Sequence, residues 1–162
     1  MPVALILPLS VTLGLLAWGL IALWYIWPRI RDLNAREALI PLILPHCFRY
    51  LGLSFLIHGV TTDALDPRFS WPTAYGDLLT ALLAFAAVIA LRSHARFAKA
   101  LVWLFSAVGV ADFLNAFARG LTFVEPGSFG ATYYIPMAVV PPLMISHLLI
   151  IAYLLRRPHR TA

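Results

Sequence analysis

The sequence has 162 residues, of which 62% are hydrophobic and 12% charged, and its formal net charge is +5. Soluble domains average about 45–50% apolar and about 25% charged residues, so this composition excludes an ordinary soluble domain. Most basic residues flank apolar runs instead of forming a patch, which argues against nucleic acid as a partner. The single cysteine, Cys47, excludes an intramolecular disulfide and a zinc-binding cysteine pair.

Five apolar runs are long enough to cross about 30 Å of hydrocarbon at about 1.5 Å per residue. The sequence therefore predicts an all-α, polytopic integral membrane protein, a single-domain bundle of five transmembrane helices. We expect the spans at residues 2–27, 38–60, 74–91, 97–118 and 132–155. The first run is longer than the apolar region of a signal peptide and has no basic residue before it, so we expect it to be retained.

Prolines interrupt two of these runs. In the second, Pro41 and Pro45 either kink the helix or separate an interfacial segment from a shorter span that starts near His46. The turn-rich residues 61–73 before the third run predict a loop. The fifth run should bend or loosen near Val140, because it contains three prolines, Pro136, Pro141 and Pro142.

The distribution of basic residues predicts an orientation. Nine Lys and Arg residues follow the first, third and fifth runs, namely Arg29, Arg31, Arg36, Arg92, Arg96, Lys99, Arg156, Arg157 and Arg160. The other side has two, Arg68 and Arg119. Because cytoplasmic loops carry the excess of positive charge, we expect the N-terminus outside and the C-terminus in the cytoplasm. The abundance of Arg, Ala and Leu favours a bacterial inner membrane, where membrane lipids are the first partners.

Several ionisable residues fall inside the apolar runs, where a charge costs about 2.5–3.5 kcal/mol. Asp112, Asn115 and Arg119 share one helical face, and Arg49 is the expected counter-charge for Asp112 or for Asp77. We therefore predict an intramembrane polar cluster of Arg49, Asp77, Asp112 and Asn115. An ion pair that fixes helix packing is the favoured interpretation. A pathway for an ion or a proton is the alternative.

Two histidines, His46 and His147, are expected on different helices at similar depth. They could be the two axial ligands of a b-type haem, or they could form hydrogen bonds across helices. Nearby small residues would admit a macrocycle, although close helix packing explains them equally well. We predict no cofactor, with haem b as the alternative, and the sequence leaves any metal open.

No catalytic residues are predicted, because no nucleophile elbow and no Gly-rich phosphate loop is present. The stretches HCFRYLGLSFLIHGV, AYGDLLTALLAFAAVIAL and LVWLFSAVGVADFLNAF resemble small uncharacterised bacterial inner-membrane proteins with several helices. The first stretch also resembles the opening helix of DoxX-like proteins. The resemblance implies a helical membrane protein and no particular activity.

We expect a non-enzymatic integral inner-membrane protein, either an accessory subunit of a larger membrane complex or a binder of an apolar ligand. Two alternatives remain. A redox protein linked to haem or quinone would use His46 and His147, and a small proton-coupled transporter would use the face of Asp112.

Overall fold

The computed structural model describes residues 2, 5–61, 65–125 and 127–156. This part of the chain is helical and contains no named strand. Its elements are α1 (Ile6–Ile21), η2 (Ala22–Ile26), α2 (Trp27–Ile30), α3 (Ala35–Ile43), η3 (Leu44–Leu56), α4 (Pro67–Arg92), α5 (Ala98–Phe123), η4 (Gly130–Tyr133), η5 (Ile135–Val139) and α6 (Val140–Leu155). They join into five helices that are long and apolar enough to cross a membrane, which confirms the predicted all-α class and the number of long helices.

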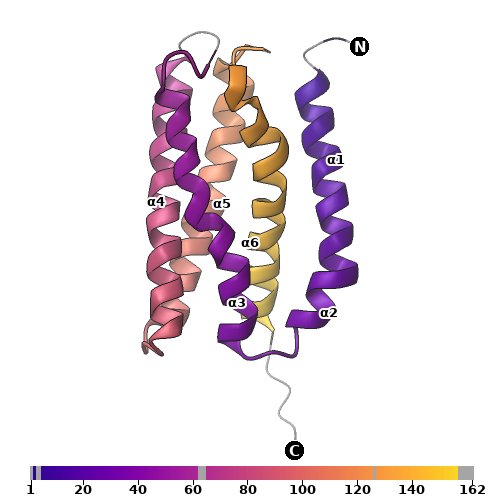
Figure 1. Ribbon diagram of the computed structural model, residues 1–162, viewed down its shortest axis with the longest axis vertical. Coiled ribbons are helices and arrows are strands. Elements are labelled where there is room, and N and C mark those ends of the chain that lie inside the picture. The colour runs from indigo at the N-terminus through magenta and orange to yellow at the C-terminus, as the bar shows by residue number, and fades with distance from the viewer. Residues whose placement is uncertain (1, 3–4, 62–64, 126, 157–162) are drawn as a thin grey trace, which may run out of the picture.

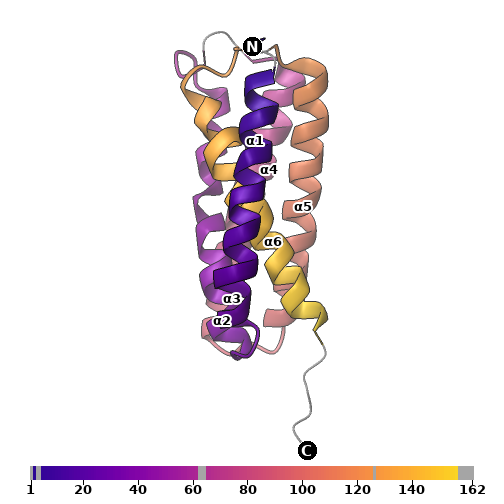
Figure 2. The same ribbon diagram turned by 90° about the vertical axis from the view of Figure 1, so that its right-hand side faces the viewer.

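Four of the long helices form a core, and the first lies at its edge. In Figure 1, α3 with η3, α4, α5 and α6 surround a common centre, while α1 runs alongside α6. Figure 2 shows α1 in front of α6. Val11 is the only residue of α1 that is buried, and Gly14 of α1 lies against Pro141 of α6. The first long helix is therefore attached to a four-helix bundle along α1, and it enters the apolar core only at its C-terminal end, through Ala22 and Ile30.

The second long helix changes type along its length. It is α-helical to Ile43 and then continues as a 3₁₀ helix of 13 residues, with Pro45 in the first turn of η3. A 3₁₀ helix has three residues per turn, so side chains three positions apart point the same way. His46, Arg49, Gly52 and Phe55 follow this spacing, and all four are buried. The prolines therefore coincide with a change of helix type, and η3 presents one straight row to the core.

Helix α4 begins at Pro67, earlier than the expected residue 74. The side chain of Asp66 accepts a hydrogen bond from the backbone N–H of Arg68 at 2.8 Å, and Pro67 occupies the first turn. An Asp cap followed by Pro is a favoured helix start. The expected loop at 61–73 is therefore wrong for residues 67–73, while residues 62–64 of that prediction lie outside the described part.

The predicted loosening near Val140 is confirmed. A π-helical segment, η5, covers Ile135–Val139 and includes Pro136, and regular α-helix resumes at Val140. The wider turn of a π segment accommodates the carbonyl that the ring of a proline would otherwise meet. The fifth long helix thus passes from η5 into α6 without a break in the chain path (Figure 2).

The apolar core has two parts. One contains the alanines of α4, Ala84, Ala87 and Ala90, packed with residues of α3 and α5. The other, at the opposite end of the bundle, contains Phe55, Phe69 and Phe129 with Leu65. Small alanine side chains let α3 and α5 approach α4 closely. The buried charged residues Arg49, Asp77 and Asp112 lie along the helices between these two parts.

Candidate functional site

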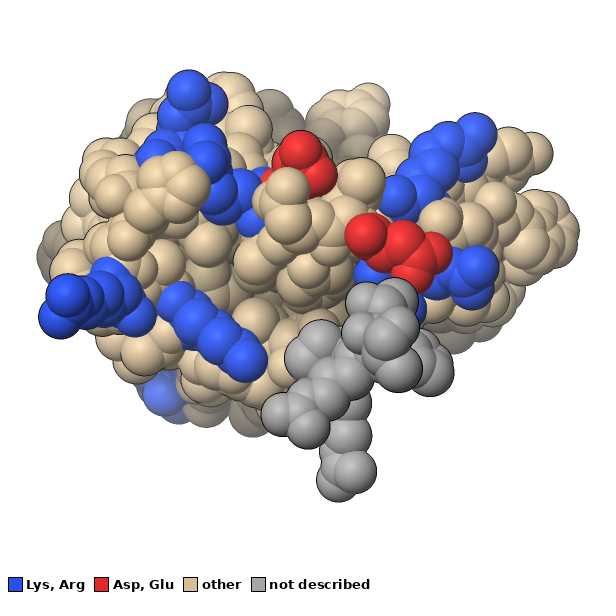
Figure 3. Space-filling view, turned by 90° about the horizontal axis from the view of Figure 1, so that it is seen from below, with Lys and Arg blue, Asp and Glu red and all other residues tan. Residues whose placement is uncertain are grey.

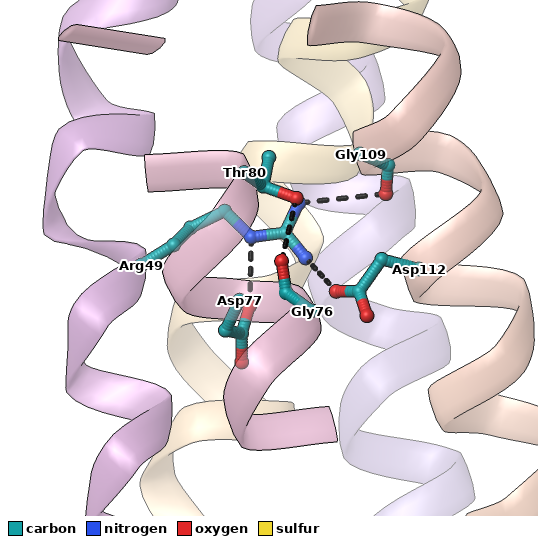
Figure 4. Close-up of polar contacts among 6 residues, drawn as sticks. All are labelled: Arg49, Gly76, Asp77, Thr80, Gly109 and Asp112. Carbon is teal, nitrogen blue, oxygen red and sulfur yellow. Dashed lines mark hydrogen bonds and ion pairs between the residues drawn. The ribbon is translucent and has the colours of Figure 1, made fainter. Parts of the chain in front are cut away.

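Arg49 makes two buried ion pairs in the middle of the bundle (Figure 4). Its Nε donates to Oδ1 of Asp77 at 2.7 Å, and its Nη2 donates to Oδ2 of Asp112 at 2.5 Å. The Arg49 side chain is 1% exposed, and the two carboxylates are 12% and 7% exposed. Charge-assisted hydrogen bonds of this length are the strong ones. We call Arg49, Asp77 and Asp112 the Arg49 cluster; it ties together η3, α4 and α5.

The remaining sides of the Arg49 guanidinium are also covered. Its Nη1 donates to the carbonyl oxygen of Gly109 at 3.4 Å, and its Cζ lies 3.9 Å from the ring centroid of Phe113. A guanidinium over an aromatic face is attracted by the ring electrons, and the attraction is stronger away from water. The cation is thus enclosed by two carboxylates, a carbonyl and a ring. The sequence predicted either Asp77 or Asp112 as its partner, and the structure gives it both.

Glycines make the space for the charged side chains. A Cβ at Gly52 would collide with the Asp77 carboxylate, and a Cβ at Gly76 would collide with that of Asp112. The Gly76 carbonyl accepts a hydrogen bond from the Thr80 hydroxyl at 2.8 Å (Figure 4). Each carboxylate therefore enters a space that a glycine leaves open on the preceding core helix. The small residues around Gly52 were noted in the sequence, whereas Gly76 was missed, although the pair Gly76–Asp77 inside an apolar helix was a visible signal.

His46 and His147 contact each other directly, with ring centroids 4.2 Å apart. Both are buried, at 0% and 1% exposure, and Phe105 lies against both rings at 5.0 and 4.9 Å. Within the described residues, none of the four ring nitrogens has a hydrogen-bond partner. We call these two residues the imidazole pair. A third glycine, Gly109, makes room for His147, since a Cβ there would overlap the His147 ring.

The imidazole pair does not fit the haem interpretation. Two axial histidines must hold the macrocycle between them, whereas these rings are in mutual contact. The other expectation, hydrogen bonds across helices, is also wrong for the described residues. The glycines of η3 and α5, Gly52 and Gly109, lie against Asp77 and His147 of neighbouring helices, which agrees with the close-packing alternative and not with space for a macrocycle.

Asn115 does not join the Arg49 cluster, which corrects the predicted grouping. Its Oδ1 accepts a hydrogen bond from Nε of Arg119 at 2.7 Å, and Arg119 also donates to the carbonyl of Arg68 at 2.7 Å. The three residues that were expected to share one face of α5 therefore separate into two groups. Asp112 faces the bundle centre, while Asn115 and Arg119 form a separate contact with the first turn of α4.

The other features of the described residues lie apart from the Arg49 cluster. The described residues contain no group of three or more His, Cys, Asp or Glu that could hold a metal ion. Cys47 is buried in the apolar core. A cavity of about 180 Å³ opens between the end of η3 and the start of α4, where His58, Ser70 and Trp71 line it, and it includes no residue of the Arg49 cluster.

The fold and the site together define a bundle of five long apolar helices with buried charges at its centre. The chain belongs to the family described as Domain of unknown function (DUF8737), whose model matches residues 6–155. No curated protein and no solved structure matches it. The family carries no assigned activity, and none of these comparisons links the chain to DoxX-like proteins.

Proposed function

We propose that this chain is a non-enzymatic, polytopic integral protein of the bacterial inner membrane, which serves as an accessory subunit of a membrane complex or as a binder of an apolar ligand. One observation carries the proposal: the polarity of the bundle is inverted relative to a soluble protein. Arg49, Asp77 and Asp112 are buried, whereas large apolar side chains such as Leu16 and Leu23 are 60% and 65% exposed. Lipid is the solvent that favours this arrangement.

The Arg49 cluster supports a role in which the bundle holds a fixed shape. It links three helices through short, buried hydrogen bonds, and the two carboxylates occupy spaces left by glycines. Such a cluster sets the rotation and register of the helices, because any other arrangement would leave charges unpaired in an apolar interior. A rigid bundle with an apolar surface is suited to contact lipid, a partner helix or an apolar ligand.

The charge distribution supports the proposed orientation. Figure 3 views the bundle from the end where the chain leaves α6, and basic side chains stand around this end. The described residues contribute seven, Arg29, Arg31, Arg36, Arg92, Arg96, Lys99 and Arg156. Arg68 and Arg119 lie toward the opposite end, in the first turn of α4 and the last turns of α5. We place the basic end in the cytoplasm.

Two experiments test the proposal. Single cysteines at Glu125 and Ser93, in a Cys47→Ala background, report orientation through a membrane-impermeant maleimide on intact spheroplasts. We expect Glu125→Cys to react and Ser93→Cys to react only after lysis; the reverse pattern would overturn the orientation. Purification in mild detergent followed by mass spectrometry should then yield a stoichiometric protein partner or a retained apolar molecule. A monodisperse monomer that retains neither would contradict the proposed role.

A further inference from the structure

We propose that the Arg49 cluster is a proton-binding site that holds one proton on its two carboxylates, and that the imidazole pair delivers and removes this proton. This goes beyond the fixed shape described above, because it assigns a ligand to the centre of the bundle. The proton site rests on the proposed membrane setting in one respect only, namely that water is absent around the site.

The first argument is the balance of charge. One guanidinium faces two carboxylates, and both ion pairs are buried. With all three groups ionised, the site has an unbalanced negative charge in an apolar interior, which is costly. One proton on either carboxyl group removes that charge and leaves Arg49 paired with the other. Both carboxylates bond the same guanidinium, through Nε and Nη2, so the proton can reside on either without a change of partner.

The second argument is the imidazole pair. A buried polar group without a partner is rare, because it loses its hydrogen bonds to water. Here two buried imidazoles have four unpartnered nitrogens among the described residues. A neutral imidazole carries one N–H and one free lone pair, so it can accept a proton at one nitrogen and release one from the other. The two ring centroids lie 4.2 Å apart and no hydrogen bond joins the rings, so a proton can pass between them, as in a relay, only after a ring turns to bring two nitrogens together.

The two groups lie next to each other. His46 precedes Arg49 by one 3₁₀ turn, about 6 Å along the axis, on the same row of η3. Because α3 and η3 run away from the basic end, His46 lies on that side of Arg49 (Figure 1). The ring of His147 abuts Gly109, whose carbonyl faces Arg49, and lies 6.0 Å from the Phe113 ring that covers Arg49.

No other described charge competes for the proton in this region. The titratable or charged side chains that face the centre come from four helices: Arg49 and His46 from η3, Asp77 from α4, Asp112 from α5 and His147 from α6. The buried thiol of Cys47 belongs to the apolar core. In the exchange itself, an imidazolium nitrogen must first turn toward a carboxylate, and one O–H bond then forms on the carboxylate as one N–H bond of the imidazolium breaks. No electron is transferred and no other reactant is needed.

Infrared spectroscopy of the protein in nanodiscs tests the proposal, because a protonated carboxyl has a carbonyl band distinct from that of a carboxylate and the band shifts in D₂O. We expect this band in the unmodified protein at neutral pH. Asp77→Asn and Asp112→Asn should each abolish it completely, since either change leaves one carboxylate balanced by Arg49. A spectrum without the band, or a band that persists in either variant, would overturn the proposal.

The control for these spectra is Asp66→Asn. Arg68 donates hydrogen bonds to Asp66 and holds the pKa of that carboxyl below its ordinary value, so Asp66 is ionised at neutral pH and its loss should leave the band unchanged. Circular dichroism and size exclusion establish that each variant is folded. Asp77→Asn and Asp112→Asn are both expected to abolish the band, so the test can be made if only one of these two variants folds.

The rate at which the band shifts after transfer to D₂O tests the relay. Glutamine has a polar side chain but cannot carry the proton, so His46→Gln and His147→Gln should keep the band and slow its shift at least tenfold. An unchanged rate in both variants would refute the relay. The infrared results do not depend on whether a partner or an apolar molecule is retained during purification. Failure of the proton site can therefore be distinguished from failure of the proposed accessory role.

Discussion

The Asp112 carboxylate of α5 lies directly over the Cα of Gly76 in α4, in space that the side chain of any other residue would occupy. This contact allows α5 to deliver a carboxylate to Arg49 without spreading the helices. Glycine is required here by the close approach of a neighbouring side chain and not by backbone conformation, because Gly76 lies within a regular helix.

Gly76→Ala should therefore destabilise the bundle by about 1–3 kcal/mol, the usual effect of overpacking, with a further loss as Asp112 is displaced from Arg49. The measurement is unfolding in mixed micelles of increasing denaturing detergent. Gly19→Ala is the matched control, since no atom lies within 4 Å of the position of its Cβ apart from its own helix backbone and chain neighbours. That change should be neutral or stabilising by up to about 1 kcal/mol. Equal effects of the two substitutions would contradict the role of Gly76.

Removal of Arg49 should cost more than removal of either carboxylate. Asp112→Leu leaves Arg49 paired with Asp77, whereas Arg49→Leu leaves two buried carboxyl groups without a counter-charge. Breaking a buried pair in this way costs about 3–5 kcal/mol. We expect the double variant Arg49→Leu, Asp112→Leu to be more stable than Arg49→Leu alone, as measured in the same detergent unfolding assay. Additive losses would show that the two side chains are energetically independent.

The three-residue periodicity of the buried side chains in η3 can be tested by mutation. In a 3₁₀ helix Phe55 lies on the face of Arg49, whereas an α-helix would place Leu53 and Leu56 closer to it. Phe55→Ala should then cost about 3–5 kcal/mol, because the ring packs against Phe69 and Phe129. Leu53→Ala and Leu56→Ala should each cost less than half as much. The opposite ranking in thermal unfolding would indicate an α-helical second span.

A pH effect is expected at the basic end of the bundle. Asp32 accepts hydrogen bonds from Nη2 of Arg156 at 2.9 Å and from Nε of Arg31 at 3.2 Å. The bond from Arg156 is the main cause that lowers the pKa of Asp32 below 3.8. A carboxyl with a lowered folded-state pKa stabilises the fold above its unfolded pKa, and this stabilisation is lost as the pH falls through the folded value.

The melting temperature of Asp32→Asn should therefore lie below that of the unmodified protein at pH 7, and the difference should disappear as the pH falls through the lowered folded-state pKa of Asp32. The Asp32 side chain is 66% exposed, so the difference should be small and should shrink in high salt. Glu37→Gln serves as a control, because Glu37 makes no ion pair in the described part of the chain. A difference that grows as the pH falls would contradict the assigned pairing.

The long helices and the partners of Arg49 were predictable because both depend on large free energies. A run of about 20 apolar residues has few alternatives to a long apolar helix, and a buried Arg requires a carboxylate. The start of α4 could also have been predicted, since Asp66 followed by Pro67 is a common helix start. It was not predicted because the surrounding residues have the composition of a turn.

The contact of His46 with His147 and the separation of Asn115 from Asp112 were not predictable. Both depend on how each helix is rotated about its own axis, which the glycines and the change to a 3₁₀ helix decide. The spacing of residues along one helix specifies which side chains share a face, but not which face of the neighbouring helix receives them.

In the proposed membrane setting, the 3₁₀ form of η3 relates the length of the second long helix to the thickness of the bilayer. At about 2.0 Å per residue, its 13 residues cover about 26 Å, whereas an α-helix of the same residues would cover about 20 Å. A bilayer that thins by a few ångströms favours the shorter form. That conversion would turn Arg49 and Phe55 away from a common face. In that setting, the thickness of the bilayer and the position of Arg49 opposite Asp77 and Asp112 are therefore coupled.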